Sequence, residues 1–293
     1  MRSTTAQSKS RVRPASWWRA LARVPMGVYN HGALGYAKGA SYSALLSFFP
    51  VFAVTIAALS EANASAVARR IATLLYEFSP PEVAQLFRAW FTDHIRHPQS
   101  LRVAAVLLSL WAASGVMASL IEAFQATYEK RDTRGVVRQR LLEIALVLLS
   151  LLPAVGATAL ILLGDWVETN ILRALGMLGT EDILRPGVRL VGRLVRYGVA
   201  LSSIGLVTVM LYWLGPDMKG RRRLLPGAIL ATILWLALTQ SFAWYVRNYG
   251  NYNLLYGSVG AVVAFLVWMY LLALVAMIGC EFNAALDRAA GKS

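Results

Sequence analysis

Long apolar runs separated by clusters of charge are the feature that most constrains this chain. The last run, residues 259–280, contains no Asp, Glu, Lys or Arg. An α-helix needs about 20 apolar residues to cross the hydrocarbon core of a bilayer. A helix also satisfies its own backbone hydrogen bonds, which lipid cannot do. The pattern therefore predicts an all-α, polytopic membrane protein.

Six stretches have this length and character, and each is expected to form a transmembrane helix. The predicted spans are 40–60, 103–126, 141–163, 190–214, 225–246 and 259–280. The chain is 57% hydrophobic and only 15% charged, whereas soluble domains carry about 25% charged residues. We expect a disordered basic tail at 1–16, an interfacial amphipathic segment at 17–38, a six-helix transmembrane domain at 39–284 and a tail at 285–293. Within that domain, residues 61–100 are predicted to form amphipathic helices on the outer surface.

The charges between the spans predict an orientation. The loops at 128–140 and 215–223 are basic, whereas the connection at 164–188 is acidic. Cytoplasmic loops of membrane proteins carry the excess of Lys and Arg, so both termini are expected in the cytoplasm. The net charge of +14 does not favour nucleic acid, because the basic residues flank apolar spans instead of forming one face.

A row of arginines begins the fourth span. Arg189, Arg193 and Arg196 follow i, i+4, i+7 spacing and so share a helix face. Such a row can bind the phosphate or carboxylate of a lipid headgroup. In the alternative interpretation these side chains extend to the outer interface or pair with the acidic connection.

Polar residues also gather at the inner ends of the second and third spans. Glu122, Gln125 and Glu129 are predicted to share a face, and Glu143 follows Arg140 closely. Two interpretations stay open: a polar cavity or proton relay, and salt bridges across the 128–140 loop. At the end of the sixth span, Glu281 and Asn283 favour a capping or helix-contact role.

Enzyme chemistry finds little support in the residues. His94 and His97 have the spacing to share a helical face, but no third metal ligand is suitably spaced. No Gly-rich phosphate loop or nucleophile elbow occurs. The lone Cys280 lies in an apolar run and is expected to be buried. We therefore expect no enzymatic activity, no metal and no cofactor.

Several motifs resemble the YihY/BrkB family of bacterial inner-membrane proteins. The matching stretches are ASYSALLSFFP (40–50), WAASG (111–115), LPGA (225–228), NYN (251–253), YGSVGA (256–261), WMY (268–270) and GCEFNA (279–284). The resemblance covers about residues 30–287. It implies six membrane helices in the bacterial inner membrane. The family was once labelled ribonuclease BN, a label regarded as mistaken, and some members are associated with export of lipid or lipopolysaccharide precursors.

The matched positions supply further candidate lipid-binding residues. Pro50 interrupts the first span and frees a backbone carbonyl, and Tyr42 and Ser47 are expected to face an interior that it opens. The other lipid-binding candidates lie near the end of the second span and at the two ends of the sixth: Glu122, Gln125, Tyr252, Asn253, Tyr256, Gly257, Glu281 and Asn283. The sequence departs from the family pattern at Gln125, where many relatives have Asn.

Together these features predict a transporter-like inner-membrane protein that handles or exports an amphiphile such as an anionic lipid. The alternative is a structural scaffold of the envelope that engages protein partners through 61–100 and 164–188. The expected partners are membrane lipids, with a homo-oligomer or an envelope protein as further options and no nucleic acid. A nuclease, as the old label suggests, is a third and weaker hypothesis.

Overall fold

The computed structural model describes residues 14–61, 99–130, 134–151, 153, 155–156, 186–216, 223–249 and 257–290. Its labelled helices are α1 (Pro14–Asn30), α2 (Ala33–Glu61), α5 (Gln99–Thr127), α7 (Pro186–Leu214), α8 (Leu225–Tyr249) and α9 (Gly257–Ala289). Residues 136–151 are helical as well. Every regular element in these ranges is a helix, so the all-α prediction is confirmed.

Four of the described helical stretches are long and apolar enough to cross a membrane. They are Val106–Thr127, Leu194–Leu214, Leu225–Tyr245 and Val262–Ala289. These coincide with the predicted second, fourth, fifth and sixth spans. The predicted spans at 40–60 and 141–163 fall only partly on residues whose side chains the structure describes. The chain is membrane-integral.

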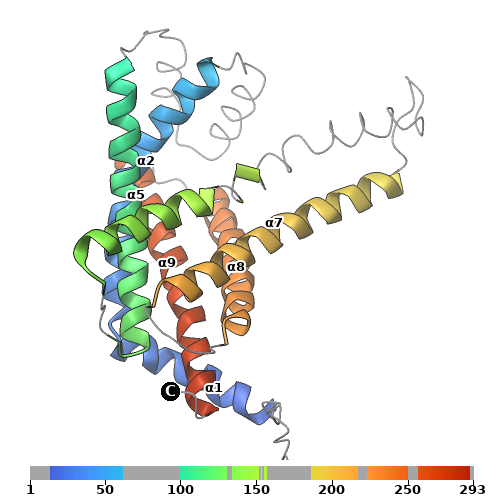
Figure 1. Cartoon of the computed structure of the whole chain (residues 1–293). Helices are drawn as coiled ribbons and strands as arrows, with labels where there is room; N and C mark the ends of the chain where they lie inside the picture. The colour runs from blue at the N-terminus through green and yellow to red at the C-terminus, as the bar shows by residue number, and fades with distance from the viewer. Residues whose placement is uncertain are drawn as a thin grey trace, which may run out of the picture.

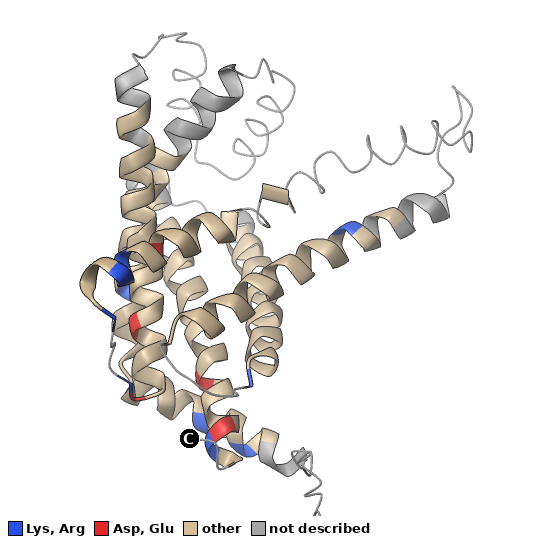
Figure 2. Ribbon diagram, in the orientation of Figure 1, with Lys and Arg blue, Asp and Glu red and all other residues tan. Residues whose placement is uncertain are grey.

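Helices α2, α5 and α9 run side by side and form the centre of the bundle (Figure 1). The α2–α5 interface is the most extensive between any two labelled helices. Helix α1 lies across the lower end of the bundle and packs on α9, whereas α7 leans away and packs mainly on α8 (Figure 1). Charged residues gather towards the α1 end and beside α5 (Figure 2).

The structure divides the segment at 17–38 between two helices. Helix α1 ends at Asn30 because Gly32 adopts a left-handed conformation, with φ of 66°, which glycine accepts without steric cost. The carbonyl of Gly32 then accepts the amides of Gly35 and Tyr36 and begins α2. One glycine thus both ends α1 and begins α2.

Helix α1 is amphipathic. Ala20, Val24 and Val28 share its buried face, whereas Trp18 and Tyr29 are exposed. Arg19 and Arg23 add basic residues to the same helix. The interfacial position expected for 17–38 stays a prediction.

Pro50 stands inside α2 and removes one backbone donor. The carbonyl of Leu46, four residues earlier, therefore lacks its helical partner. Figure 1 shows α2 leaning away from α5 in its second half, which is the expected effect of a proline in a helix interior.

Helices α8 and α9 approach each other through two glycines. A Cβ on Gly227 would collide with the carbonyl oxygen of Gly279, and a Cβ on Gly279 would collide with the hydroxyl of Tyr212. That hydroxyl donates to the carbonyl of Ala276 at 2.6 Å. Small residues that permit such contact are typical of helix interfaces in membranes.

Replacing Gly227 with Ala is expected to destabilise the protein by about 3 kcal/mol, because overpacking costs about 1–3 kcal/mol and a buried hydrogen bond is displaced as well. The measurement is the thermal unfolding temperature of the purified protein in detergent. The matched control is Gly35→Ala in α2, where an added Cβ meets no atom within 4 Å. Equal unfolding temperatures for the two variants would contradict the close α8–α9 contact.

Candidate functional site

The carboxylate of Glu281 is buried near the C-terminal end of α9 and joins three parts of the chain. Glu281 is only 2% exposed. Its Oε1 accepts the hydroxyl of Thr127 at 2.8 Å and also bonds to Nδ1 of His31. Its Oε2 lies 3.6 Å from Nη2 of Arg288. We call His31, Thr127, Glu281 and Arg288 the Glu281 cluster.

The backbones of α1 and α5 pass close to this carboxylate. A Cβ on Gly27 would collide with Oε2 of Glu281, so a larger residue at this crossing of α1 and α9 would require the Glu281 carboxylate to move. Arg288 also donates to the carbonyl of Thr127 at 3.0 Å, which satisfies a backbone acceptor at the end of α5. A buried carboxylate is tolerated when it is paired and hydrogen-bonded in this way.

Glu129 approaches His31 from the other side of the imidazole. Helix α5 ends in a Schellman motif, with Lys130 N–H donating to the carbonyl of Gln125 and Glu129 N–H to that of Ala126, both at 3.0 Å. Glu129 occupies the left-handed position with φ of 54°, where glycine is usual. Its Oε1 lies 3.9 Å from Nε2 of His31. The imidazole therefore stands between two carboxylates.

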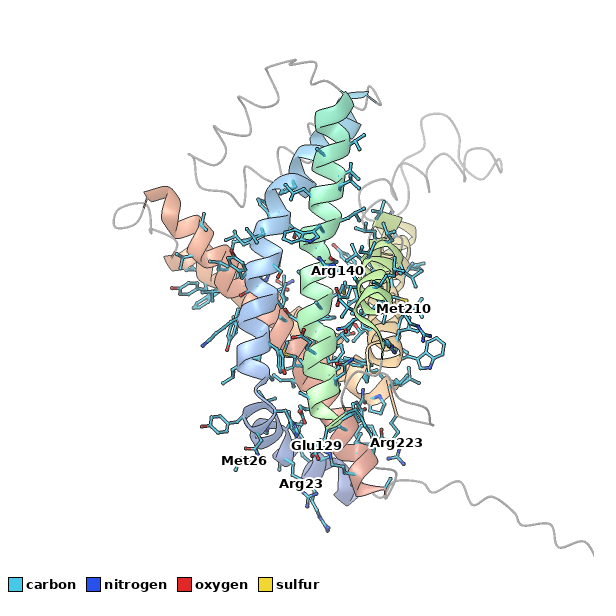
Figure 3. All side chains as sticks on the ribbon, turned by 60° about the vertical axis from the view of Figure 1, so that its left-hand side comes forward. Arg23, Met26, Glu129, Arg140, Met210 and Arg223 are labelled. Carbon is cyan, nitrogen blue, oxygen red and sulfur yellow. The ribbon has the colours of Figure 1, made fainter. Side chains whose placement is uncertain are left out.

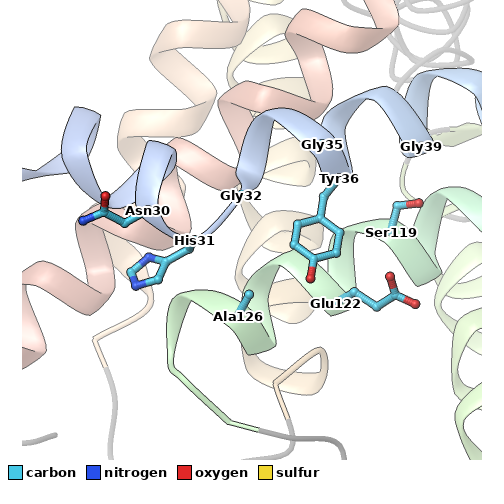
Figure 4. Close-up of a pocket in the computed structure, with 9 residues that line it drawn as sticks. All are labelled: Asn30, His31, Gly32, Gly35, Tyr36, Gly39, Ser119, Glu122 and Ala126. Carbon is cyan, nitrogen blue, oxygen red and sulfur yellow. The ribbon is translucent and has the colours of Figure 1, made fainter.

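A pocket opens beside this cluster, between the first half of α2 and the second half of α5 (Figure 4). It has a volume of about 790 Å³, and we call it the groove. Its lining residues are Asn30, His31, Gly32, Gly35, Tyr36, Gly39, Ser119, Glu122 and Ala126. Tyr36 from α2 and Glu122 from α5 project into the same space (Figure 4). Gly32 and Gly35 have no atom within 4 Å of an added Cβ, so their missing side chains keep the groove open.

His31 belongs to both features. Its Nδ1 bonds to the buried Glu281, while its ring forms part of the groove wall. Any change in the groove that moves this ring acts directly on a partner of Glu281.

Asn283 and Asp287 cap α8 from the neighbouring helix. The amide of Gly227 donates to Oδ1 of Asn283 at 2.7 Å, and Nδ2 of Asn283 donates to the carbonyl of Leu224 at 3.0 Å. Both carboxylate oxygens of Asp287 lie 3.3 Å from the amide nitrogen of Arg223. The first amides of a helix need such acceptors. Asn283 and Glu281 both make contacts of the capping or helix-contact kind predicted for them. Their role as lipid-binding residues stays a prediction.

Helix α5 ends at Thr127, so Glu129 lies beyond the helix that carries Glu122 and Gln125, and the three side chains predicted to share a face have different surroundings. Glu122 lies in the groove, whereas Gln125 is buried and its Nε2 has no hydrogen-bond partner in the described part of the chain. Glu143 pairs with Arg140 at 2.8 Å within one helix, not across the loop. Arg140 also lies over the ring of Trp111, 5.9 Å from its centroid. Figure 3 places Arg140 well above Glu129 along the bundle.

The remaining predicted residues are dispersed. Ser47 is buried, but Tyr42 is 61% exposed, so the prediction that Tyr42 faces an interior is wrong. In a membrane helix both faces are apolar, so the sequence pattern alone did not distinguish its inner side. Arg196 is buried on α7, and the side chains of Arg189 and Arg193 lie outside the described part. Gly257 is the first residue of α9. Tyr252, Asn253 and Tyr256 lie outside the described residues, as do His94 and His97, most of 61–100 and most of 164–188.

Sequence reasoning missed His31, Thr127 and Gly27 as members of one site. His31 is separated from Glu281 by 250 positions, and no local pattern connects them. The available signal was an imidazole directly before a glycine at the end of an amphipathic helix. Among the described residues, no group of three or more His, Cys, Asp and Glu side chains is arranged to hold a metal ion.

Replacing Glu281 with Gln is expected to destabilise the protein by about 3 kcal/mol, because removing one partner of a buried ion pair leaves the others unsatisfied. Thermal unfolding in detergent measures the change. The matched control is Glu129→Gln, because the Glu129 side chain is 78% exposed and exposed pairs contribute about 0–1 kcal/mol. An unfolding temperature for Glu281→Gln equal to that of the control would show that the cluster does not hold the helices together.

Comparison with known proteins places this architecture in a family. A family model described as virulence factor BrkB matches residues 27–293. The ribonuclease-like protein YfkH of Bacillus subtilis is 26% identical over 261 residues, which are 87% of this chain and 90% of YfkH. A UPF0761 membrane protein of Tolumonas auensis is 23% identical over 84% of this chain and 78% of its own length.

A second UPF0761 membrane protein, from Alkalilimnicola ehrlichii, is 24% identical over 98% of this chain. The match covers 63% of that relative, so this chain spans less than two thirds of its length. No solved structure matches the chain. Because the family model covers nearly all of the described helices, the chain belongs to the BrkB virulence-factor family of membrane proteins.

Proposed function

We propose that this protein is a transporter-like, non-catalytic protein of the bacterial inner membrane that handles or exports an amphiphile. The groove is the single observation that carries the proposal. It is large enough for a ligand, since ligand pockets commonly measure about 300–1,000 Å³, and polar side chains from α1, α2 and α5 converge on it.

The groove also lies at a depth that suits a lipid headgroup. Glu122 belongs to the candidate span Val106–Thr127, about 7 Å from its end at the helical rise of 1.5 Å per residue. Charged side chains inside a span are costly and typically line a pathway or site. The N-terminal half of the same helix carries exposed apolar side chains: Leu107, Leu108 and Trp111. A headgroup in the groove could therefore keep its acyl chains along α5.

Six spans with both termini in the cytoplasm remain part of the proposal. The four candidate spans and the long helix α2 are compatible with it. Arg23 and Arg223 lie together with Glu129 at the α1 end of the bundle (Figure 3). Because basic loops favour the cytoplasmic side, we propose that this end, with the groove and the Glu281 cluster, lies at the inner leaflet.

Filling the groove tests the function. Gly35→Leu is expected to lower lipid retention about tenfold, a change equivalent to about 1.4 kcal/mol of binding free energy. Native mass spectrometry of gently solubilised protein, with lipid identification, measures retention. The matched control is Gly198→Leu on α7, where an added Cβ also meets no atom within 4 Å.

Equal lipid retention in both leucine variants would refute the groove as a lipid site. If crosslinking in native membranes then captured a reproducible envelope protein, the scaffold hypothesis would be favoured. RNA cleavage by highly purified protein, lost in a variant of this chain, would instead support the activity suggested by the name of YfkH.

Cysteine labelling tests the orientation. Cys280 is buried and its replacement by Ala gives a cysteine-free background. In that background Ser8→Cys and Ser293→Cys are expected to react with a membrane-impermeant maleimide only after the inner membrane is opened, and Thr180→Cys before it is opened. Labelling of Ser8→Cys in intact spheroplasts would reverse the orientation.

A further inference from the structure

We propose that the groove recognises the ammonium group of its amphiphile, with Glu122 as the counter-charge. This inference rests on the proposed function, because it names the headgroup chemistry of the same site. It departs from the anionic lipid that the sequence suggested, and it follows from the charges that line the groove.

The residues that line the groove include an acidic side chain and neither Lys nor Arg. Glu122 is the one carboxylate among the nine lining residues. His31 is the one other ionisable group besides the Tyr36 phenol, and two carboxylates already face its ring: Glu281 at Nδ1 and Glu129 at Nε2. A proton on His31 is therefore balanced by these partners. A phosphate that reached Glu122 would meet a like charge, whereas an ammonium would be attracted.

Glu122 lacks the partner that a carboxylate in a membrane requires. Within the described part of the chain, no side chain forms a salt bridge or hydrogen bond with it. The nearby Glu143 is already paired with Arg140 at 2.8 Å, so that arginine is committed elsewhere. An unpaired charge inside a span is costly, and a cationic ligand would supply the missing partner.

The surrounding groups match the donors of an ammonium. An alkylammonium carries three N–H donors and no acceptor. Ser119 uses its hydroxyl proton on the carbonyl of Gly115 at 3.1 Å, which leaves its oxygen free to accept. The phenol oxygen of Tyr36 and the amide oxygen of Asn30 are further acceptors in the lining. The Tyr36 ring offers a face for a cation as well, and Figure 4 shows it directed to the same space as Ser119 and Glu122.

The backbone provides the access. Gly32 and Gly35 present no side chain to the groove, so a headgroup can approach the α2 backbone closely. At Gly39 the helices are nearer, since an added Cβ would lie 3.1 Å from Oγ of Ser119. The wide part of the groove is thus the part next to Tyr36 and Glu122, where the ammonium is assigned.

A pair of lipids that differ only at nitrogen tests the inference. Full-length protein in nanodiscs is offered phosphatidylethanolamine and its N-acetyl derivative in equal amounts, and retained lipid is quantified by native mass spectrometry. Wild-type protein is expected to retain the free amine at least tenfold better. Glu122→Gln should remove this preference, and the charge-conserving Glu122→Asp should keep most of it.

The outcomes separate the two proposals. No amine preference in the wild type, or an undiminished preference in Glu122→Gln, would overturn the ammonium site even if Gly35→Leu still lowered total lipid retention. Unchanged retention in Gly35→Leu would instead remove the groove function itself. Soluble ethanolamine at the same concentration should leave the lipid bound; displacement would reassign the site to free amines. Thermal unfolding of each variant confirms that the bundle is intact.

Discussion

The buried carboxylate of Glu281 is the interaction on which the arrangement of the other helices depends. Removing a carboxylate from water is costly unless its oxygens are paired, and each partner here belongs to a different part of the chain. His31 places the turn between α1 and α2, Thr127 places the end of α5, and Arg288 closes the cluster from α9 itself. Gly27 and the left-handed Glu129 are local consequences of fitting backbone around this one group.

Polar contacts from the C-terminal half of α9 hold the remaining helices in the same way. Asn283 accepts the amide of Gly227 in the first turn of α8, and Asp287 accepts the amide of Arg223 just before that helix. The carbonyl of Ala276 accepts the hydroxyl of Tyr212 from α7. Lipid is as apolar as the side chains that it contacts, so burial of hydrocarbon does little to hold membrane helices together. Polar contacts and close glycine contacts must supply specificity, and α9 concentrates both over a few turns.

Local features of the fold were predictable, and long-range ones were not. An apolar run is a property of neighbouring residues, so the second, fourth and fifth spans and the start of the sixth were located within a few positions. The end of the sixth was not, because its helix continues past the predicted end at 280 to Ala289. The contact of Asn283 matches one of the two roles predicted for it, because a polar residue at the end of a span can cap or bond to a neighbouring helix. His31 and Thr127 became partners of Glu281 only through the packing of three distant segments, and the exposed Tyr42 shows that a motif does not reveal which face points inward.

The groove and the Glu281 cluster are physically linked because they share one imidazole. The His31 ring bonds to a buried carboxylate through Nδ1, so it cannot rotate to suit a ligand without breaking that bond. The groove wall at His31 is therefore fixed as long as the Glu281 cluster is intact. Glu122 has no such support and stands on the opposite wall. The groove thus combines one fixed wall with one unpaired carboxylate. This arrangement favours a ligand that carries a positive charge over a ligand that carries none, because only the former can pair with Glu122 without a change in the protein.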